Sequence, residues 1–438
     1  MGPPARELGL WSATALVVGH AIGVGIFLTP ADLIGALASP VLTLSLWIVC
    51  GAIVLAGALT FGELASRFPH AGGPYIYLRE AWGERLAFLY GWQSLLVMDP
   101  GVTAALTTGA SQYVVVLWPA AAGSERWIAI ATIWALAVVN ITGLKLSARV
   151  LGVMTAFKLL SLAGVVILAF AAGKGQWSNF ATAPGARVGA PPLAEALALG
   201  LVSVFFSFAG FWEASRIAGE VREPGRTLPR ALALGVGCLT LVYVVTTCAF
   251  IYLVPPREAT SAPAFASRAG VALLGAAGPP ALAAVVVLSV VVSAMALIMM
   301  APRLYLAMSQ DGVFPSALAA LNPVTGAPAR ATAVLAALAS VFVLLGTFEQ
   351  IVSFLVCTAM GFIALAAGAL LVVRRRNPHA GTFRAPGYPL TTWIFVLLVA
   401  GVVALVAINR PWQAAAGFGL VALGWPAYSL FAPARRRG

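Results

Sequence analysis

Long apolar runs alternate with short polar segments along the whole chain. We identify twelve apolar spans, at residues 10–36, 40–61, 87–118, 127–142, 150–172, 193–215, 232–254, 275–301, 331–347, 350–373, 389–408 and 411–431. A helix needs about 20 residues to cross a bilayer, and each run is near or above that length. The pattern predicts an all-α integral membrane protein with twelve transmembrane helices.

Composition and charge agree with this prediction. Of 438 residues, 61% are hydrophobic and 9% are charged, whereas soluble proteins carry about 25% charged residues. With the N-terminus placed inside, 19 of the 26 Lys and Arg residues fall on the inner side, 6 fall outside, and Lys158 lies within a span. The bias predicts cytoplasmic termini and an inner (plasma) membrane location. The net charge of +12 is therefore a topology signal, and we expect no nucleic-acid partner.

Two spans are interrupted in the middle. The first contains GHAIGVGIFLTP (19–30), with its break at Gly23–Gly25, and the sixth contains a break around Phe208–Gly210. Matching breaks five spans apart are typical of transporters built from two repeats. Because five is odd, the second repeat enters the membrane inverted. We expect repeats at 1–172 and 173–373, followed by two accessory helices and a basic tail at 374–438.

Such a break leaves backbone groups unpaired in the membrane interior. The freed N–H groups of one half-helix attract a carboxylate, and the freed carbonyl groups of the other accept hydrogen bonds from an ammonium. An amino acid carries both groups. The pair of breaks therefore favours a main-chain site for a zwitterion over the alternative, in which the glycines only allow close helix packing.

Five motifs in order are similar to those of the amino acid–polyamine–organocation (APC) superfamily, and closest to bacterial relatives of the L-amino acid transporters. They are GHAIGVGIFLTP, ELASRFPHAGGPYIYLREAWGE, FSFAGFWEASRIAGEVREPGRTLPRA, PRLYLAMSQDGVFP and RRRNPHAGTFRAPGYP. The resemblance implies the leucine-transporter-type fold, with two inverted five-helix repeats, broken helices 1 and 6, and alternating access.

The resemblance also implies a substrate site. The predicted site residues are Ile22, Gly23, Val24, Gly25, Phe206, Ser207, Ala209, Gly210, Trp212 and Glu213. The family pattern puts the substrate carboxylate on N–H groups around Gly23–Gly25. It puts the ammonium on carbonyl groups near Ile22 and from Phe206, Ser207 and Ala209, with Phe206 covering the substrate. Many relatives have Ser where this chain has Val24, which removes a hydroxyl donor.

Four titratable residues within spans are functional candidates. Lys158 lies too deep to reach the interface easily, although snorkelling is the alternative; the resemblance implies that it replaces the sodium ion of sodium-coupled members. Asp99 is expected to pair with a cation, cap a break or carry a proton. His20 is expected to titrate near neutral pH or to hydrogen-bond a neighbouring helix. Glu213 is expected to line the pocket or to pair with Arg216 at i+3.

Charged residues near the inner ends of spans suggest structural or gate-closing ion pairs. Glu220 is expected to pair with Arg226 and Arg230, and Glu63 with Arg67.

The remaining sequence favours transport over other membrane functions. No catalytic motif, channel filter, Walker motif or soluble receptor domain is present, so we expect no enzyme activity. The four cysteines form neither a disulfide framework nor a metal site. We predict no cofactor and no metal, and a monomer or an oligomer of unknown size without an evident partner subunit.

The predicted function is secondary-active transport of a neutral L-amino acid, because the main-chain site reads the α-amino and α-carboxyl groups. Sodium-independent exchange and proton symport through a carboxylate or His20 both remain open. The alternative substrate is a cationic amino acid or polyamine, attracted by Glu213 and Asp99.

Overall fold

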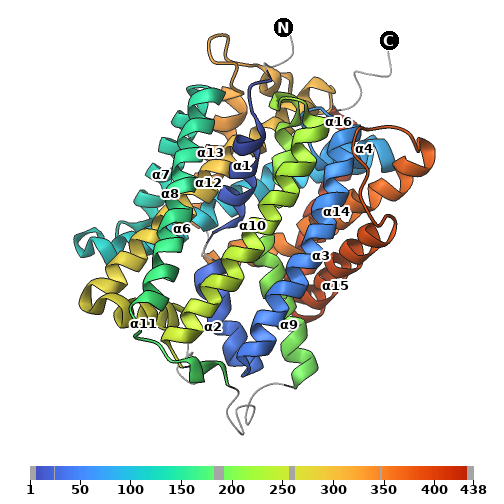
Figure 1. Cartoon of the computed structure of the whole chain (residues 1–438). Coiled ribbons are helices and arrows are strands. Elements are labelled where there is room, and N and C mark those ends of the chain that lie inside the picture. The colour runs from blue at the N-terminus through green and yellow to red at the C-terminus, as the bar shows by residue number, and fades with distance from the viewer. Residues whose placement is uncertain (1–5, 24, 182–191, 256–261, 346–347, 432–438) are drawn as a thin grey trace.

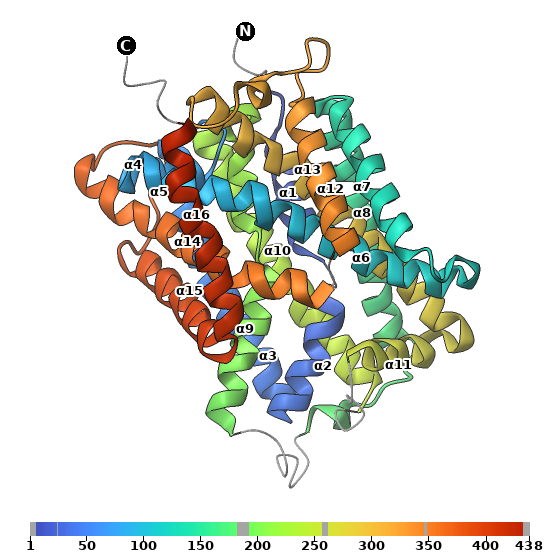
Figure 2. The ribbon, with the colours of Figure 1, turned by 180° about the vertical axis from the view of Figure 1, so that it is seen from behind.

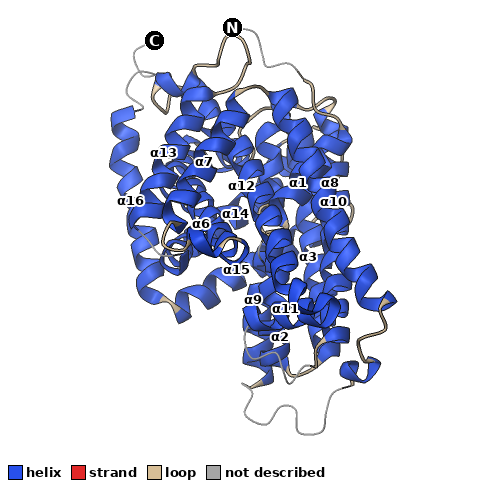
Figure 3. Cartoon of the chain, turned by 90° about the vertical axis from the view of Figure 1, so that its left-hand side faces the viewer, coloured by secondary structure: helices blue, strands red, loops and turns tan. Residues whose placement is uncertain are grey.

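The computed structural model describes residues 6–23, 25–181, 192–255, 262–345 and 348–431. Within these ranges the chain is helical, with no β-strand and one isolated bridge between Leu8 and Val221 (Figure 3). In the described part of the chain, eight helices or helix runs are long and apolar enough to cross a membrane, and the bent pair at the N-terminus makes a ninth if it is counted as one span. The all-helical membrane class is thus confirmed, while the count of twelve spans stays a prediction.

A helix overlaps each of the first five predicted spans. They are α1 (Leu10–Ala21) with α2 (Gly25–Leu37), α3 (Pro40–Arg67), α5 (Glu84–Gln93) continued by the π-helix η1 (Ser94–Met98) and α6 (Asp99–Leu117), α7 (Glu125–Ile141) and α8 (Leu144–Ala171). The short α4 (Pro74–Trp82) connects α3 to α5, and the 3₁₀ turns η2 (Pro119–Ala121) and η3 (Trp177–Phe180) lie in loops.

The later spans also overlap helices. They are α9 (Leu193–Phe208) with the 3₁₀ helix η4 (Phe211–Glu220), α10 (Pro224–Leu253), α12 (Gly278–Gln310), α13 (Ala329–Leu345), α14 (Phe348–Arg376), α15 (Leu390–Asn409) and α16 (Pro411–Phe431). The connections contain α11 (Ala262–Leu274), η6 (Gly275–Ala277) and η7 (Ser316–Ala319). Figure 2 shows α14, α15 and α16 together on one flank.

Several helices extend beyond the predicted spans. Helix α10 begins at Pro224 instead of 232, and α12 ends at Gln310 instead of 301. Hydropathy marks only the apolar part of a helix, and these polar ends continue the hydrogen-bond ladder on the side where α1 begins and α16 ends (Figure 1). The first span is divided as predicted, with α1 toward the termini and α2 toward the opposite end.

Small residues bring the central helices together. Helices α3 and α10 run side by side (Figure 1), and a Cβ added at Gly51 of α3 would lie 2.5 Å from Oγ1 of Thr240 in α10. One added at Gly235 of α10 would lie 2.4 Å from Val17 of α1. Such contacts are common where helices pack in membranes. They hold the half-helix α1 against a long, unbroken neighbour.

Candidate functional site at the two helix breaks

The first break separates α1 from α2. Helix α1 ends at Ala21, α2 begins at Gly25, and the two axes differ by 53°. Ile22 has left the helical region (φ −73°, ψ 83°), and the Gly23 N–H turns back to the Ala21 carbonyl at 2.8 Å. The predicted interruption of the first span is therefore present. Val24 lies outside the described residues.

The second break separates α9 from η4. Ala209 is extended (φ −58°, ψ 148°), and Gly210 adopts φ +96° in the left-handed region. A side chain is disfavoured at that backbone angle. It would also collide with a neighbour, because a Cβ on Gly210 would lie 2.5 Å from the His20 ring. The glycine thus allows the second break to pack directly on the helix turn that precedes the first.

Tyr243 of α10 connects the two breaks. Its hydroxyl oxygen lies 2.6 Å from the Ser207 carbonyl oxygen and 3.1 Å from the Ala21 carbonyl oxygen. The single hydroxyl proton is therefore placed between carbonyl groups that the ends of α9 and α1 leave without a helical partner. The hydroxyl groups of Thr29 and Ser207 form a second link, at 3.0 Å, between α2 and α9.

Lys158 of α8 is fully buried beside the first break. Its Nζ lies 3.0 Å from the Gly19 carbonyl oxygen, 2.9 Å from the Ser289 carbonyl oxygen and 3.5 Å from Ser293 Oγ. These three acceptors match the three donors of an ammonium group. The expected hydrogen bond to a carbonyl of the broken first helix is present, and the lysine does not snorkel.

Ser293 of α12 supports the same turn of α1. Its Oγ lies 3.0 Å from the carbonyl oxygens of both Gly19 and Ile22. His20 Nδ1 lies 3.2 Å from the Ser293 carbonyl oxygen, so the histidine bonds a neighbouring helix, which was one of its two predicted roles. Helix α12 thus contacts the first break through both a side chain and the main chain.

The predicted substrate residues in the described ranges differ in accessibility. Four residues next to the breaks are partly accessible, namely Gly23, Gly25, Phe206 and Ala209, and three are buried there, namely Ile22, Ser207 and Gly210. Trp212 and Glu213 are 1% exposed and point into the protein interior.

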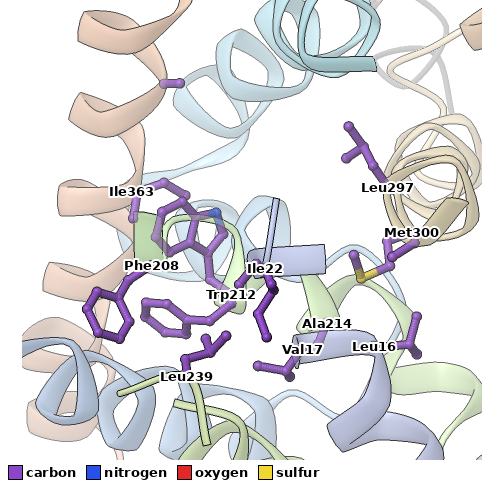
Figure 4. Close-up of a cluster of buried hydrophobic side chains, with 14 of the residues drawn as sticks. Leu16, Val17, Ile22, Phe208, Trp212, Ala214, Leu239, Leu297, Met300 and Ile363 are labelled. Carbon is purple, nitrogen blue, oxygen red and sulfur yellow. The ribbon is translucent and has the colours of Figure 1, made fainter. Parts of the chain in front are cut away.

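Trp212 of η4 belongs to a cluster of buried apolar side chains from several helices. Figure 4 shows it with Ile22 and Phe208 among buried hydrophobic side chains. Its indole Nε1 donates to Glu213 Oε1 at 2.9 Å. The packing accounts for the position of both side chains without a ligand.

Glu213, Asp99 and Arg216 form a buried ion cluster. Arg216 Nε lies 2.5 Å from Glu213 Oε2, and Nη1 donates to Asp99 Oδ2 at 2.9 Å. Arg216 Nη2 donates to the Tyr90 hydroxyl oxygen at 2.8 Å, and the Tyr305 hydroxyl donates to Asp99 Oδ2 at 2.8 Å. The pairing of Glu213 with Arg216 was one of the alternatives from sequence. Pairing with a cation was likewise one of the expected roles of Asp99, but the identity of that cation was not predicted, nor were the contributions of Tyr90 and Tyr305, because these residues come from α6, α5 and α12.

The ion pairs near the termini differ in part from expectation. Glu63 pairs with Arg67 at 2.7 Å, as predicted. The pairing of Glu220 with Arg226 and Arg230 is wrong: Glu220 pairs with Arg303 of α12 at 3.1 Å.

Glu220 does not pair with Arg226 because the two side chains face different surroundings. Glu220 is 4% exposed at the end of η4 and faces α12. The Arg226 side chain is 71% exposed and lies 3.8 Å from Glu223. The Glu220 carbonyl oxygen also accepts the N–H groups of Glu7 and Leu8, so the chain entering α1 is joined to the end of η4.

No group of three or more His, Cys, Asp or Glu side chains in the described ranges is arranged to hold a metal ion.

Gly210→Ala should destabilise the protein more than Gly312→Ala. Both glycines have positive φ, but Gly312 has no atom within 4 Å of its Cβ position. Gly312→Ala carries only the backbone cost of about 1–2 kcal/mol, and Gly210→Ala adds a clash with His20 worth about 1–3 kcal/mol. Thermal unfolding in detergent, followed by tryptophan fluorescence, measures the difference. Equal midpoints for the two variants would contradict the close packing of the breaks.

Comparisons with known proteins agree with this architecture. Residues 8–424 match the model of a family described as amino acid permease. The chain is 27% identical over 399 residues to the serine/threonine exchanger SteT of Bacillus subtilis (strain 168), which covers 90% of this chain and 89% of the relative. It is 27% identical over 434 residues to the human cystine/glutamate transporter (97% and 85%), and 30% identical over 326 residues to the human large neutral amino acids transporter small subunit 2 (72% and 60%). The chain therefore belongs to the amino acid permeases of the APC superfamily, a family of membrane transporters and not of enzymes.

Proposed function

We propose that this protein is a sodium-independent secondary-active transporter that moves a neutral L-amino acid across the plasma membrane by alternating access, with both termini in the cytoplasm. The observation that supports it best is the joining of two helix breaks by one hydroxyl group, that of Tyr243. The breaks bring N–H groups and carbonyl groups of opposite polarity together within the membrane-spanning part of the chain.

The substrate contacts that we propose come mainly from the main chain. The carboxylate accepts hydrogen bonds from the N–H groups at Gly23–Gly25, where α2 begins; the Gly23 N–H exchanges its bond to the Ala21 carbonyl for one to the substrate. The ammonium donates to carbonyl groups among Ile22, Phe206, Ser207 and Ala209. The Ile22 and Ser207 carbonyls already accept from Ser293 and Tyr243, but a carbonyl oxygen has two lone pairs and can accept again. Phe206, partly accessible beside Ala209, is the cover.

A neutral substrate fits the surroundings better than a cationic one. A lysine side chain or a polyamine would need a carboxylate presented to it, and the carboxylates of Asp99 and Glu213 instead accept from Arg216, Tyr305 and Trp212. Beside Gly23 lie Leu106 of α6 and the Ser293 hydroxyl, each 3.8 Å from the Cβ position. The substrate side chain therefore meets small or apolar groups, and Trp212 and Glu213 are not needed in the pocket.

We also propose the division into inverted repeats at 1–172 and 173–373, with accessory helices at 374–438. Its support is the position of the breaks, one in the first span of each proposed repeat. Lys158 stands at the last span of the first repeat and contacts α1 and α12. We propose that the amino group of Lys158, at this position between α1 and α12, substitutes for a sodium ion.

Counterflow in proteoliposomes tests the proposal. We expect preloaded unlabelled amino acid to accelerate uptake of labelled neutral L-amino acids without sodium, since Lys158 already occupies the position that we propose for a substitute of the sodium ion. A panel of neutral, acidic and cationic amino acids and a polyamine gives the substrate class. The proposal would be overturned if the protein transported none of these compounds, or if it transported only cationic amino acids and polyamines.

Lys158→Ala should reduce counterflow about tenfold or more without preventing membrane insertion. The substitution removes the three hydrogen bonds that Nζ donates to the Gly19 and Ser289 carbonyl oxygens and to Ser293 Oγ. A hydrogen bond from a charged donor is worth about 1.5–3 kcal/mol. Lys174→Ala is the matched control, because Lys174 donates to a single carbonyl, that of Leu273, away from the breaks. Near-normal transport by the Lys158 variant would remove the proposed role.

Tyr243→Phe should raise the half-saturating substrate concentration by about fivefold, because it removes one shared hydrogen bond worth about 1 kcal/mol. The ring is kept, so its contacts with Trp47 and Phe208 are preserved. Tyr252→Phe, in the aromatic cluster with Phe170 and Trp177, is the control. Equal concentrations for both variants and the wild type would show that the hydroxyl does not organise the site.

A further inference from the structure

The buried cluster around Arg216 contains more acids than bases. Two carboxyl groups, those of Asp99 and Glu213, share the one guanidinium group, and the three side chains are 0–2% exposed. With both carboxyl groups ionised, the cluster carries a net charge of −1. A single uncompensated charge in a medium of low dielectric constant is costly, and a buried acid normally retains a proton instead.

The groups packed around the cluster do not compensate this charge. Tyr90, Tyr305 and Trp212 face it from α5, α12 and η4 as neutral donors or acceptors. Among the described residues, no other cation makes an ion pair with Asp99 or Glu213.

Two further basic side chains, His20 and Lys158, lie outside the cluster on α1 and α8. His20 of α1 interacts electrostatically with both Arg216 and Lys158. Lys158 Nζ is already hydrogen-bonded to two carbonyl groups and a hydroxyl group on α1 and α12. It therefore interacts with the first break and forms no ion pair with the acids of the cluster.

Two carboxyl oxygens of the cluster, Asp99 Oδ1 and Glu213 Oε2, are buried without a hydrogen bond among the described residues, and they differ in whether a cation faces them. Asp99 Oδ2 accepts from both Arg216 and Tyr305, while Asp99 Oδ1 is buried and has no hydrogen-bond partner in the described part of the chain. Glu213 Oε1 accepts from Trp212, and Glu213 Oε2, although it makes no hydrogen bond, lies 2.5 Å from Arg216 Nε in an ion pair. A proton on Glu213 Oε2 would face the guanidinium group directly, whereas Asp99 Oδ1 has no cation in ion-pair contact in the described ranges. A proton placed on Asp99 Oδ1 would therefore break no observed interaction.

The segment before Asp99 offers a polar approach to that oxygen. Residues Ser94–Met98 form a π-helix, and the Asp99 N–H bonds the Ser94 carbonyl, so Ser94 stands one wide turn from Asp99. The Ser94 hydroxyl and both amide atoms of Gln93 are buried without partners in the described ranges. Buried polar atoms of this kind are commonly satisfied by water, and π-helical turns are frequent at functional sites.

We propose that Asp99 is a proton-binding site, with one proton held on Oδ1 while Oδ2 keeps its bonds to Arg216 and Tyr305. Water in contact with Ser94 and Gln93 delivers and removes this proton: an O–H bond forms on Oδ1 as hydronium becomes water. Loss of the proton adds a negative charge facing Arg216 and strengthens the tie between η4 and α6. Proton binding is thereby linked to movement of η4, and this link rests on the proposed transport function.

Infrared spectroscopy of the purified protein in lipid tests the site directly. We expect a carboxylic acid C=O band that shifts when aspartate is labelled with carbon-13, and that disappears in Asp99→Asn. Asparagine keeps an oxygen that accepts from Arg216 and Tyr305. Asp32→Asn, at an exposed aspartate of α2, is the control and should keep the band.

Absence of the band, or its persistence in Asp99→Asn, would overturn the proposal. A band that does not shift with the aspartate label would place the proton on another type of residue and also overturn the proposal. If Asp99→Asn fails to fold, loss of the band in Asp32→Asn or Asp311→Asn would overturn it, and retention of the shifted band in both would support it.

Transport measurements test the link to η4. In proteoliposomes, an inward proton gradient should raise neutral amino acid accumulation by the wild type and by Asp32→Asn, and should have no effect on Asp99→Asn. The same gradient response in all three proteins would overturn the coupling. Failure of counterflow in the wild type would instead overturn the proposed function and leave the infrared result standing.

Discussion

Backbone hydrogen bonding inside the membrane is the constraint on which this structure depends. A helix that stops in lipid exposes N–H and carbonyl groups that no water can reach, at a cost of several kcal/mol each. Helix α1 stops at Ala21 and α9 at Phe208, but carbonyl groups near both ends accept hydrogen bonds from side chains. Lys158, Tyr243 and Ser293 supply donors to the carbonyl groups beside these ends.

These donors come from three different helices, and this distribution joins the breaks to the rest of the bundle. Helix α8 contributes Lys158, α10 contributes Tyr243 and α12 contributes Ser293. Any change in the angle between α1 and α2 must therefore alter contacts with helices that are continuous from end to end. On the side of the termini, the bonds from Glu7 and Leu8 to the Glu220 carbonyl join the two broken spans again, so that α1 and η4 are held at both of their ends.

Local features of this molecule could be predicted from sequence and long-range pairings could not. Both breaks follow from glycines within apolar runs, and the burial of Lys158 follows from its depth in a span. The partners of Glu220 and Asp99 could not be derived, because Arg303 and Arg216 lie 83 and 117 residues away along the chain. The polar ends of α10 and α12 were missed for another reason: hydropathy measures the apolar part of a helix, whereas hydrogen bonding decides where it ends.

Charge balance connects the cluster at Arg216 to the site at the breaks. Lys158 carries one positive charge when it is protonated, and the cluster carries one excess negative charge when both of its acids are ionised. A positive charge on His20 would be opposed by both Lys158, when that lysine is protonated, and Arg216. The histidine is therefore suited to a neutral, packed role against Gly210. A zwitterion adds no net charge when it enters, so substrate binding alone leaves the charge of the interior unchanged, whereas protonation of an acid beside Arg216 changes it by one.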